Sequence, residues 1–173
     1  MSPLRTGERN GFGFPESFGI TTQSSGMPLR YFEDLSVGET HDVGPVQFTE
    51  ADIVAFAEQY DPQPFHTDPD AAREGPFAGL VASGWHTCAA TFRPIVADVF
   101  SNLAFAGGWG VDELRWRRPV RPGDALSVSV ELVEKRPRDD RRGDVDYDIV
   151  VKNQHEETVV TYRDHVMVER RGG

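Results

Sequence analysis

Cysteine is nearly absent from this sequence. The chain of 173 residues contains only one, Cys88. A single cysteine can form neither an intramolecular disulfide nor a metal site built from cysteines alone. Because a fold without disulfides suits a reducing compartment, the expected location is the cytoplasm.

Long apolar runs and an excess of positive charge are also missing. No run approaches the ~20 apolar residues that a membrane helix needs, and the N-terminal region lacks the apolar core of a secretory signal. The formal net charge is −10 at pH 7, so the overall field repels phosphate backbones. The sequence therefore predicts no membrane and no nucleic-acid partner.

Regular patterning begins only after the first part of the chain. Residues 1–28 mix glycine, serine and threonine with scattered phenylalanine, and they show neither a strand nor a helix period. We expect a flexible N-terminal extension there, or alternatively an arm packed on a partner subunit. Since 38% of the residues are hydrophobic, residues 29–170 can form a single domain with one core.

Two helices are predicted in the first half of this domain. In residues 50–60 the apolar side chains recur with a helical period, and Thr49 precedes them as N-cap. The helix should end before Pro62, because a residue that precedes proline is disfavoured in a helix. Residues 68–75 have the pattern of a shorter helix, with Asp68 as N-cap, proline at the first helical position and glycine after the end.

The most apolar helix is predicted over residues 83–100, where Pro94 should kink or split it. An opening strand is expected over residues 31–48. After this helix, period-2 patterns separated by turn compositions predict strands over residues 111–120, 125–135, 144–152 and 157–169. This order of elements predicts an α+β domain with one long helix against an antiparallel sheet.

An ionisable cluster lies in YDPQPFHTDPD, residues 60–70. Asp61 and His66 are separated by two prolines, which reduce the entropy lost in holding the two side chains together. A carboxylate beside an imidazole can handle protons near neutral pH. The alternative is a proline-rich turn whose aspartates only cap helices. Asp68 is explained as such a cap, so no metal site is expected here.

Ser83 and Gly84 stand at the predicted start of the apolar helix. A helix N-terminus exposes unpaired N–H groups with partial positive charge, and glycine lets a ligand approach the backbone. The Gly84 N–H is therefore a candidate donor to an oxyanion. Alternatively, Ser83 is an ordinary N-cap and Gly84 only permits close packing.

Together these motifs resemble the MaoC-like dehydratases, which include R-specific enoyl-CoA hydratases of the hot-dog fold. The family signature is an amphipathic helix that ends in D-x-N-P-x-H, followed by a helix start of the type VAHGM. The matching stretches here are DPQPFHTD (61–68), VASGW (81–85) and the strand and turn LRWRRPVRPGD (114–124). The resemblance covers about residues 29–170, and it implies a hot-dog fold.

The resemblance also implies roles. Asp61 and His66 would be the catalytic pair, and Gly84, with Ser83 beside it, would bind the thioester oxygen. The implied reaction interconverts trans-2-enoyl-CoA and (R)-3-hydroxyacyl-CoA thioesters by adding or removing water, with no metal or cofactor beyond the coenzyme A of the substrate. Gln63 stands where the signature has asparagine, and Ser83 where its commonest form has histidine.

Further expectations stay open at this stage. Gln63, Trp85 and His86 are candidates for the lining of the pocket, although a core position is an alternative for His86. A basic patch in the acidic chain is a solvated strand face or, alternatively, binds coenzyme A phosphates; it comprises Arg115, Arg117, Arg118 and Arg121. The alternative functions are an acyl-CoA thioesterase and a non-catalytic acyl-thioester-binding domain. Because a single sheet leaves an open edge, a homodimer or higher homo-oligomer is expected.

Overall fold

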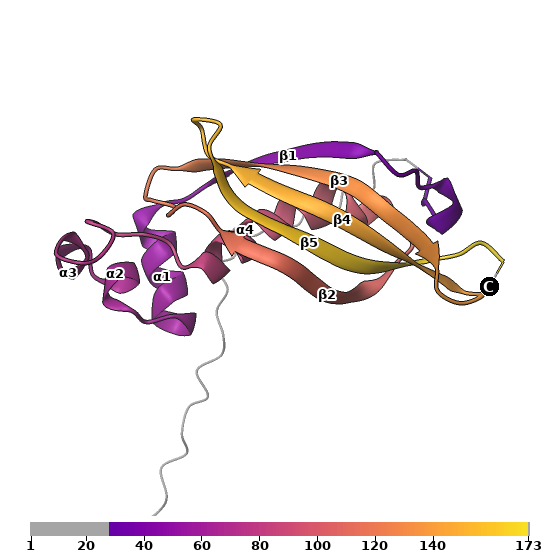
Figure 1. Cartoon of the computed structure of the whole chain (residues 1–173). Helices are drawn as coiled ribbons and strands as arrows, with labels where there is room; N and C mark the ends of the chain where they lie inside the picture. The colour runs from indigo at the N-terminus through magenta and orange to yellow at the C-terminus, as the bar shows by residue number, and fades with distance from the viewer. Residues whose placement is uncertain (1–27, 173) are drawn as a thin grey trace, which may run out of the picture.

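A five-stranded antiparallel sheet wraps around one long helix in the computed structural model, which describes residues 28–172 (Figure 1). The extension expected at residues 1–28 lies almost wholly outside the described residues. In chain order the elements are β1 (Thr40–Gln47), α1 (Glu50–Tyr60), α2 (Pro64–Thr67), α3 (Pro69–Arg73), α4 (Gly84–Asp98), β2 (Phe105–Trp116), β3 (Ala125–Pro137), β4 (Arg142–Lys152) and β5 (Thr158–Glu169). Short 3-10 turns span Phe32–Asp34 and Phe100–Asn102.

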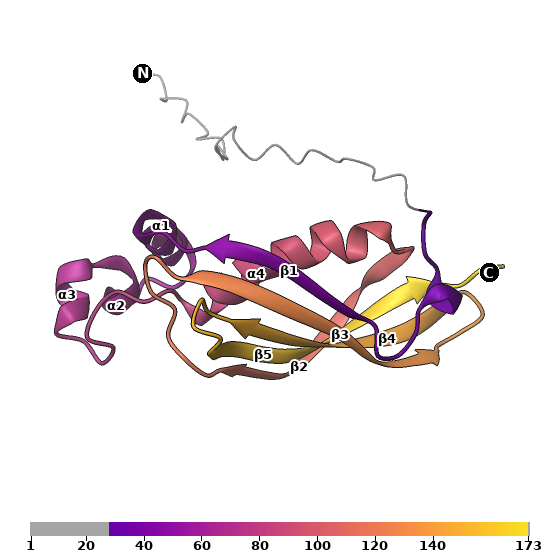
Figure 2. The ribbon, with the colours of Figure 1, turned by 90° about the horizontal axis from the view of Figure 1, so that it is seen from above.

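The strands follow the order β1-β3-β4-β5-β2. Helix α4 lies along one face of the sheet, as the view from above shows (Figure 2). Helices α1 to α3 gather at one end of the molecule, beside the N-terminal end of α4 (Figure 1). This is the α+β hot-dog architecture that the sequence predicts.

The core lies between α4 and the sheet. Buried and more exposed residues alternate along most of β3, as its period-2 pattern predicts. Each fully buried aliphatic or phenylalanine side chain contributes roughly 1.5–3 kcal/mol by leaving water. The largest side chains with almost no exposure are Phe48, Ile53, Ile95, Leu126, Leu132 and Ile149.

The predicted helix caps are confirmed. The Thr49 hydroxyl accepts a hydrogen bond from the Asp52 N–H at the start of α1 (3.1 Å). The Asp68 carboxylate accepts from the N–H groups of Asp70 and Ala71 at the start of α3. These caps satisfy donors that a helix N-terminus otherwise leaves unpaired.

Two expectations about element bounds are wrong, and of the two outcomes expected at Pro94, a kink or a split, the split is absent. Residues 31–37 do not belong to the opening strand, because the Asp34 carboxylate accepts from the Tyr31 N–H (2.9 Å) and stabilises a 3-10 turn there. Strand β2 starts at Phe105 instead of residue 111, since the glycines between them pair with β5. Helix α4 is not split at Pro94 and continues to Asp98.

Candidate active site

The sequence around the two prolines places Asp61 and His66 next to each other. Asp61 is the C-cap of α1, and its N–H donates to the Ala57 carbonyl (2.9 Å). Pro62 prevents the helix from continuing. Pro64 then starts the single turn of α2, which carries His66 back toward the end of α1. The rigid turn predicted from the two prolines thus contains a helical turn.

The imidazole of His66 is held in one orientation. Its Nδ1 lies 2.7 Å from the carbonyl oxygen of Val81, and its Nε2 lies 3.5 Å from Oδ2 of Asp61. Because a carbonyl can only accept, Nδ1 carries the proton in the neutral ring and donates it to Val81. The lone pair of Nε2 therefore faces the carboxylate side of the site, where it can accept a proton from a water.

Two side chains donate to the Asp61 carboxylate. The Ser83 hydroxyl donates to Oδ2 (2.7 Å) and the Gln63 amide donates to Oδ1 (2.8 Å). The hydrogen bond from Ser83, then that from Gln63, outweigh desolvation and, with the charge of His66, hold the pKa of Asp61 below its ordinary value. Asp61 is thus an anion at neutral pH with one lone-pair direction toward His66.

Ser83 also starts α4. Its hydroxyl accepts from the Trp85 N–H (3.2 Å) while donating to Asp61, and its side chain is fully buried. Gly84 is the first residue of the helix, so its N–H has no carbonyl one turn earlier to bond. The helix dipole adds partial positive charge at this point. Ser83 is therefore the N-cap that the sequence allows, and it also binds the Asp61 carboxylate.

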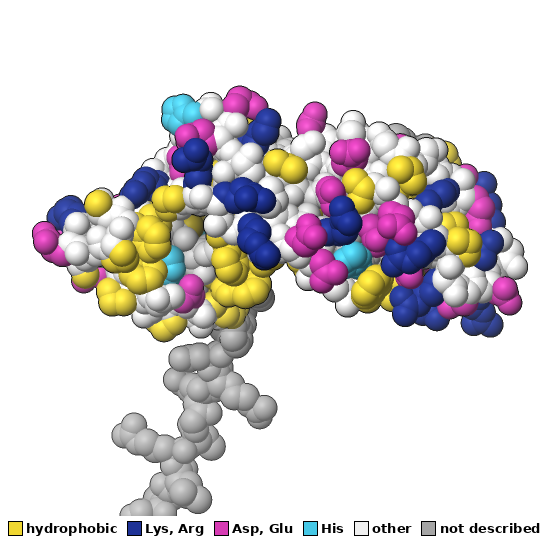
Figure 3. Space-filling model, in the orientation of Figure 1, with side chains coloured by type: hydrophobic (Ala, Val, Ile, Leu, Met, Phe, Trp, Pro, Cys, Tyr) yellow, Lys and Arg dark blue, Asp and Glu magenta, His cyan; other side chains and the backbone are white. Residues whose placement is uncertain are grey.

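These groups share one pocket of about 570 Å³ at the end of the sheet near α1 to α3. Figure 3 shows hydrophobic side chains gathered there around a histidine and an acidic side chain, with basic side chains to one side. The polar residues of the lining are Asp61, Gln63, His66, Gly84, Thr87, Arg117 and Arg118. Its aromatic residues are Phe65, Phe77, Trp85 and Trp116.

Most of the predicted site residues therefore meet in the structure. Asp61, Gln63, His66, Gly84 and Trp85 all line the pocket, and Ser83 bonds Asp61 from behind it.

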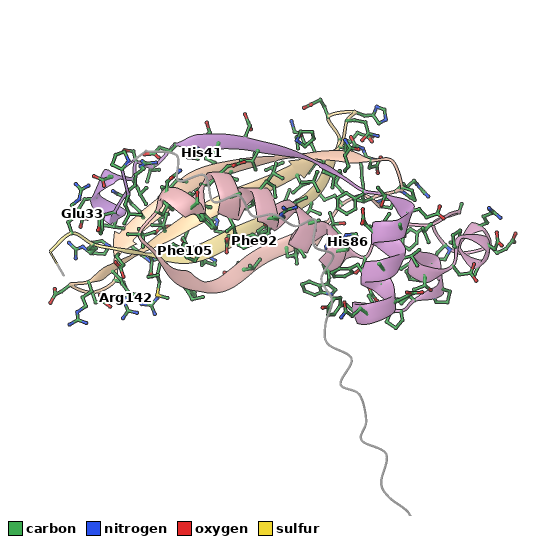
Figure 4. All side chains as sticks on the ribbon, turned by 180° about the vertical axis from the view of Figure 1, so that it is seen from behind. Glu33, His41, His86, Phe92, Phe105 and Arg142 are labelled. Atoms are coloured by element: carbon green, nitrogen blue, oxygen red, sulfur yellow. The ribbon has the colours of Figure 1, made fainter. Side chains whose placement is uncertain are left out.

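His86 is not among the lining residues. Its ring is sandwiched between Phe48 and Phe56, at 4.9 and 4.7 Å between ring centroids, at the junction of α4 and α1 (Figure 4). Desolvation there lowers the pKa of His86, against an opposing charge from Asp52. The core position is the one that the structure assigns to it.

Trp116 is a site residue that the sequence reasoning missed. It is the last residue of β2 and its indole lines the pocket. The signal in the sequence is the tryptophan between two arginines in LRWRRPVRPGD.

The site thus combines a carboxylate and an imidazole with the N-terminus of the helix that the sheet wraps around. Residues 34–154 match the family model described as the MaoC like domain. The chain belongs to the MaoC-like family.

Known proteins agree with this assignment. A 3-hydroxybutyryl-CoA dehydratase of Methylorubrum extorquens is 34% identical over 113 residues, which cover 64% of this chain and 69% of that protein. The crystal structure of a MaoC-like dehydratase from Rhodospirillum rubrum has 39% identity and a TM-score of 0.73, covering 83% of this chain and 99% of that one. The unliganded R-hydratase PhaJ1 of Pseudomonas aeruginosa has 28% identity and a TM-score of 0.63, covering 80% and 84%.

Proposed function

We propose that this protein interconverts trans-2-enoyl-CoA and (R)-3-hydroxyacyl-CoA thioesters by adding or removing water. One observation carries the proposal. Asp61 and His66 lie 3.5 Å apart with their acceptor atoms facing each other, in the same pocket as the free helix N-terminus at Gly84. Membership of a family that includes dehydratases supports the same reaction.

The first step activates a water. One water on the pocket side of the pair donates hydrogen bonds to the Asp61 anion and to the Nε2 lone pair of His66. As the water oxygen bonds C3 of the enoyl thioester, the pair takes one of its protons. Neither group needs a metal or a further cofactor to do so.

The second step neutralises an enolate. Bond formation at C3 moves the electron pair of the double bond toward the thioester oxygen, where the Gly84 N–H and the α4 dipole stabilise the negative charge. The proton held by the pair then passes to C2 from the same side. The pair returns to its starting state, and the reverse sequence dehydrates the 3-hydroxyacyl thioester.

The two departures from the family signature support an active site. Gln63 and Ser83 both donate to Asp61, so each keeps the carboxylate ionised and oriented. A chain that had become a binding module would have no need of two donors to one carboxylate. We therefore favour catalysis over the non-catalytic alternative.

Incubation with crotonyl-CoA tests the proposed reaction. Loss of the absorbance of the conjugated enoyl thioester without release of free thiol is the expected result. Thiol release would instead identify a thioesterase, and neither change would favour an acyl-thioester-binding domain.

We also propose that two copies pair along β2. This edge strand of 12 residues contains no proline, whereas the other edge, β1, is interrupted at Gly44 and Pro45. An open edge of this length is a site for strand pairing. Exposed apolar side chains on β2 extend the contact: Phe105 and Val111. Light scattering at micromolar concentration should give at least a dimeric mass, and a monomeric mass would contradict the pairing.

Among residues 28–172, no helix is long and apolar enough to cross a membrane. The ligand and the partner that we propose are an acyl-CoA thioester and a second copy of the chain.

A further inference from the structure

Trp116 occupies the space where a side chain on Gly84 would lie. A Cβ built on Gly84 would be 2.4 Å from Cε2 of the indole, 2.5 Å from Nε1 and 2.8 Å from Cδ2. Real Cβ atoms essentially never approach heavy atoms so closely. Gly84 and Trp116 therefore form a matched pair, in which the absence of one side chain makes room for the other.

The indole covers one face of the first turn of α4. Cys88 lies one turn further along the helix, where burial raises the pKa of its thiol and the nearby Trp116 side chain opposes that rise. Residues four apart share a helix face. Trp116 at the end of β2 thus packs against the first residue of α4, beside the Gly84 N–H.

The outer part of the same ring is open to the pocket. Trp116 is 48% exposed and Trp85 is 59% exposed, and their rings meet edge to face at 5.2 Å. The two half-exposed indoles lie beside the Gly84 N–H, so a ligand that reaches this N–H contacts flat apolar rings. The conjugated enoyl thioester is a planar group whose carbonyl oxygen needs such an N–H, and planar π systems stack on aromatic faces.

We propose that Trp116 is a substrate-positioning residue: its indole holds the thioester against the N-terminus of α4, and position 84 is glycine because the indole takes the place of a side chain. This inference rests on the proposed function, because it assigns Trp116 to the same thioester. It adds a residue outside the loop and helix start that carry the proposed chemistry.

Trp116→Leu should lower kcat/KM for hydration of crotonyl-CoA by about 10- to 100-fold, since small misplacements of reacting groups cost rates of this order. Trp109→Leu is the matched control. Trp109 is also on β2 and 47% exposed, but its ring stacks on His165 (4.6 Å) outside the pocket lining. The control should keep its kcat/KM, with light scattering confirming that it has the same mass as the wild type. Trp116→Phe, which retains a flat ring, should recover most of the activity.

The matched pair predicts a rescue. Gly84→Ala alone should force the indole aside and lower kcat/KM by about 100-fold. In the Trp116→Leu background the same substitution meets no ring, so it should cost little more, because substitutions of residues in contact are not additive. Full multiplication of the two losses would overturn the pairing. Thermal melts followed by circular dichroism confirm that each variant is folded.

Binding of butyryl-CoA, which has no double bond to hydrate, separates this inference from the proposed reaction. We expect it to quench tryptophan fluorescence in the wild type and to bind at least tenfold more weakly to Trp116→Leu than to Trp109→Leu. If binding depends on Trp116 but no hydration occurs, the proposed reaction is wrong and the positioning role stands. If hydration occurs and Trp116→Leu equals Trp109→Leu in both assays, the positioning role is wrong and the reaction stands.

Discussion

Among the described residues, two histidines lie beside aspartates, in different settings. Asp61 and His66 lie at the pocket, whereas Asp146 and His165 lie on the face of the sheet opposite α4. The second pair is the closer one, with 2.8 Å between Oδ1 of Asp146 and Nδ1 of His165, against 3.5 Å in the first. Distance alone would therefore not select the pair that we propose as catalytic.

The two pairs differ in what their remaining atoms bond. Nε2 of His165 is engaged by Asp112 (3.2 Å), and Asp146 also accepts from Arg136 (3.0 Å). Both ring nitrogens thus face carboxylates, so the ring serves as a charged link between β2, β4 and β5. In the first pair, Nδ1 of His66 donates to the Val81 carbonyl, and Nε2 faces the pocket. An acid–base site needs a free acceptor beside a cavity, and only the first pair has one.

The largest predicted difference is in turnover. Asp61→Asn and His66→Ala should each lower kcat for crotonyl-CoA hydration by about 100- to 10,000-fold, since each removes a group that handles the proton. The same substitutions in the second pair, Asp146→Asn and His165→Ala, should leave kcat within about twofold. Steady-state kinetics on the four variants, with circular dichroism as the folding control, makes the comparison. Equal losses from both pairs would remove the distinction.

Ser83→Ala should have a smaller effect on turnover and a specific effect on pH dependence. The Ser83 hydrogen bond is the main cause of the lowered pKa of Asp61, so its loss raises that pKa. The acid limb of the kcat/KM profile should therefore move toward neutral pH, with about a tenfold loss at the plateau. Ser101→Ala is the control, because that hydroxyl donates only to the Ala97 carbonyl. An unshifted acid limb would show that Ser83 acts only as a helix cap.

The second pair should matter for stability instead. His165→Ala leaves the buried Asp146 carboxylate with one partner fewer, and losing a hydrogen bond to a buried charged group costs about 1–3 kcal/mol. Urea denaturation measures this change in the free energy of unfolding. His155→Ala, in the exposed turn between β4 and β5, should change it by less than about 0.5 kcal/mol. A negligible effect of His165→Ala would mean that the link is not stabilising.

The smallest expected effect is a pH dependence of that stabilisation. Desolvation opposes charging of His165, but its hydrogen bond to Asp146 and the nearby carboxylates raise its pKa above 6.5. A raised pKa stabilises the fold fully below the unfolded value, and the stabilisation is lost as pH rises through the folded pKa. The difference in unfolding free energy between wild type and His165→Ala should therefore shrink as pH rises from about 6. A difference that grows with pH would contradict the charged link.

The sequence predicted the first pair and missed the second for a physical reason. Asp61 and His66 are close in the chain, and the prolines between them constrain a short segment. Their contact therefore depends only on local structure. The partners of His165 lie 19 and 53 residues away and reach it only through the register of β4 and β2 on β5. Spacing along the chain carries no signal for such contacts.

The same distinction between local and long-range contacts separates the parts of the fold that the sequence predicts from those that it does not. Helix caps and strand periods are local, and the predicted capping residues of α1, α3 and α4 hold in the structure. The early start of β2 depends on backbone partners in β5 that compensate for its glycines. Trp116 was missed because its role depends on meeting Gly84 across the fold.

The joint action of Asp61 and His66 on one water is tested most directly by a double-mutant cycle. The measurement is kcat for crotonyl-CoA hydration in Asp61→Asn, His66→Ala and the variant with both substitutions. Groups that act as a unit are strongly non-additive, so the double variant should be within about threefold of the slower single variant. Losses that multiply in the double variant would show that the two residues act independently, and would contradict the mechanism.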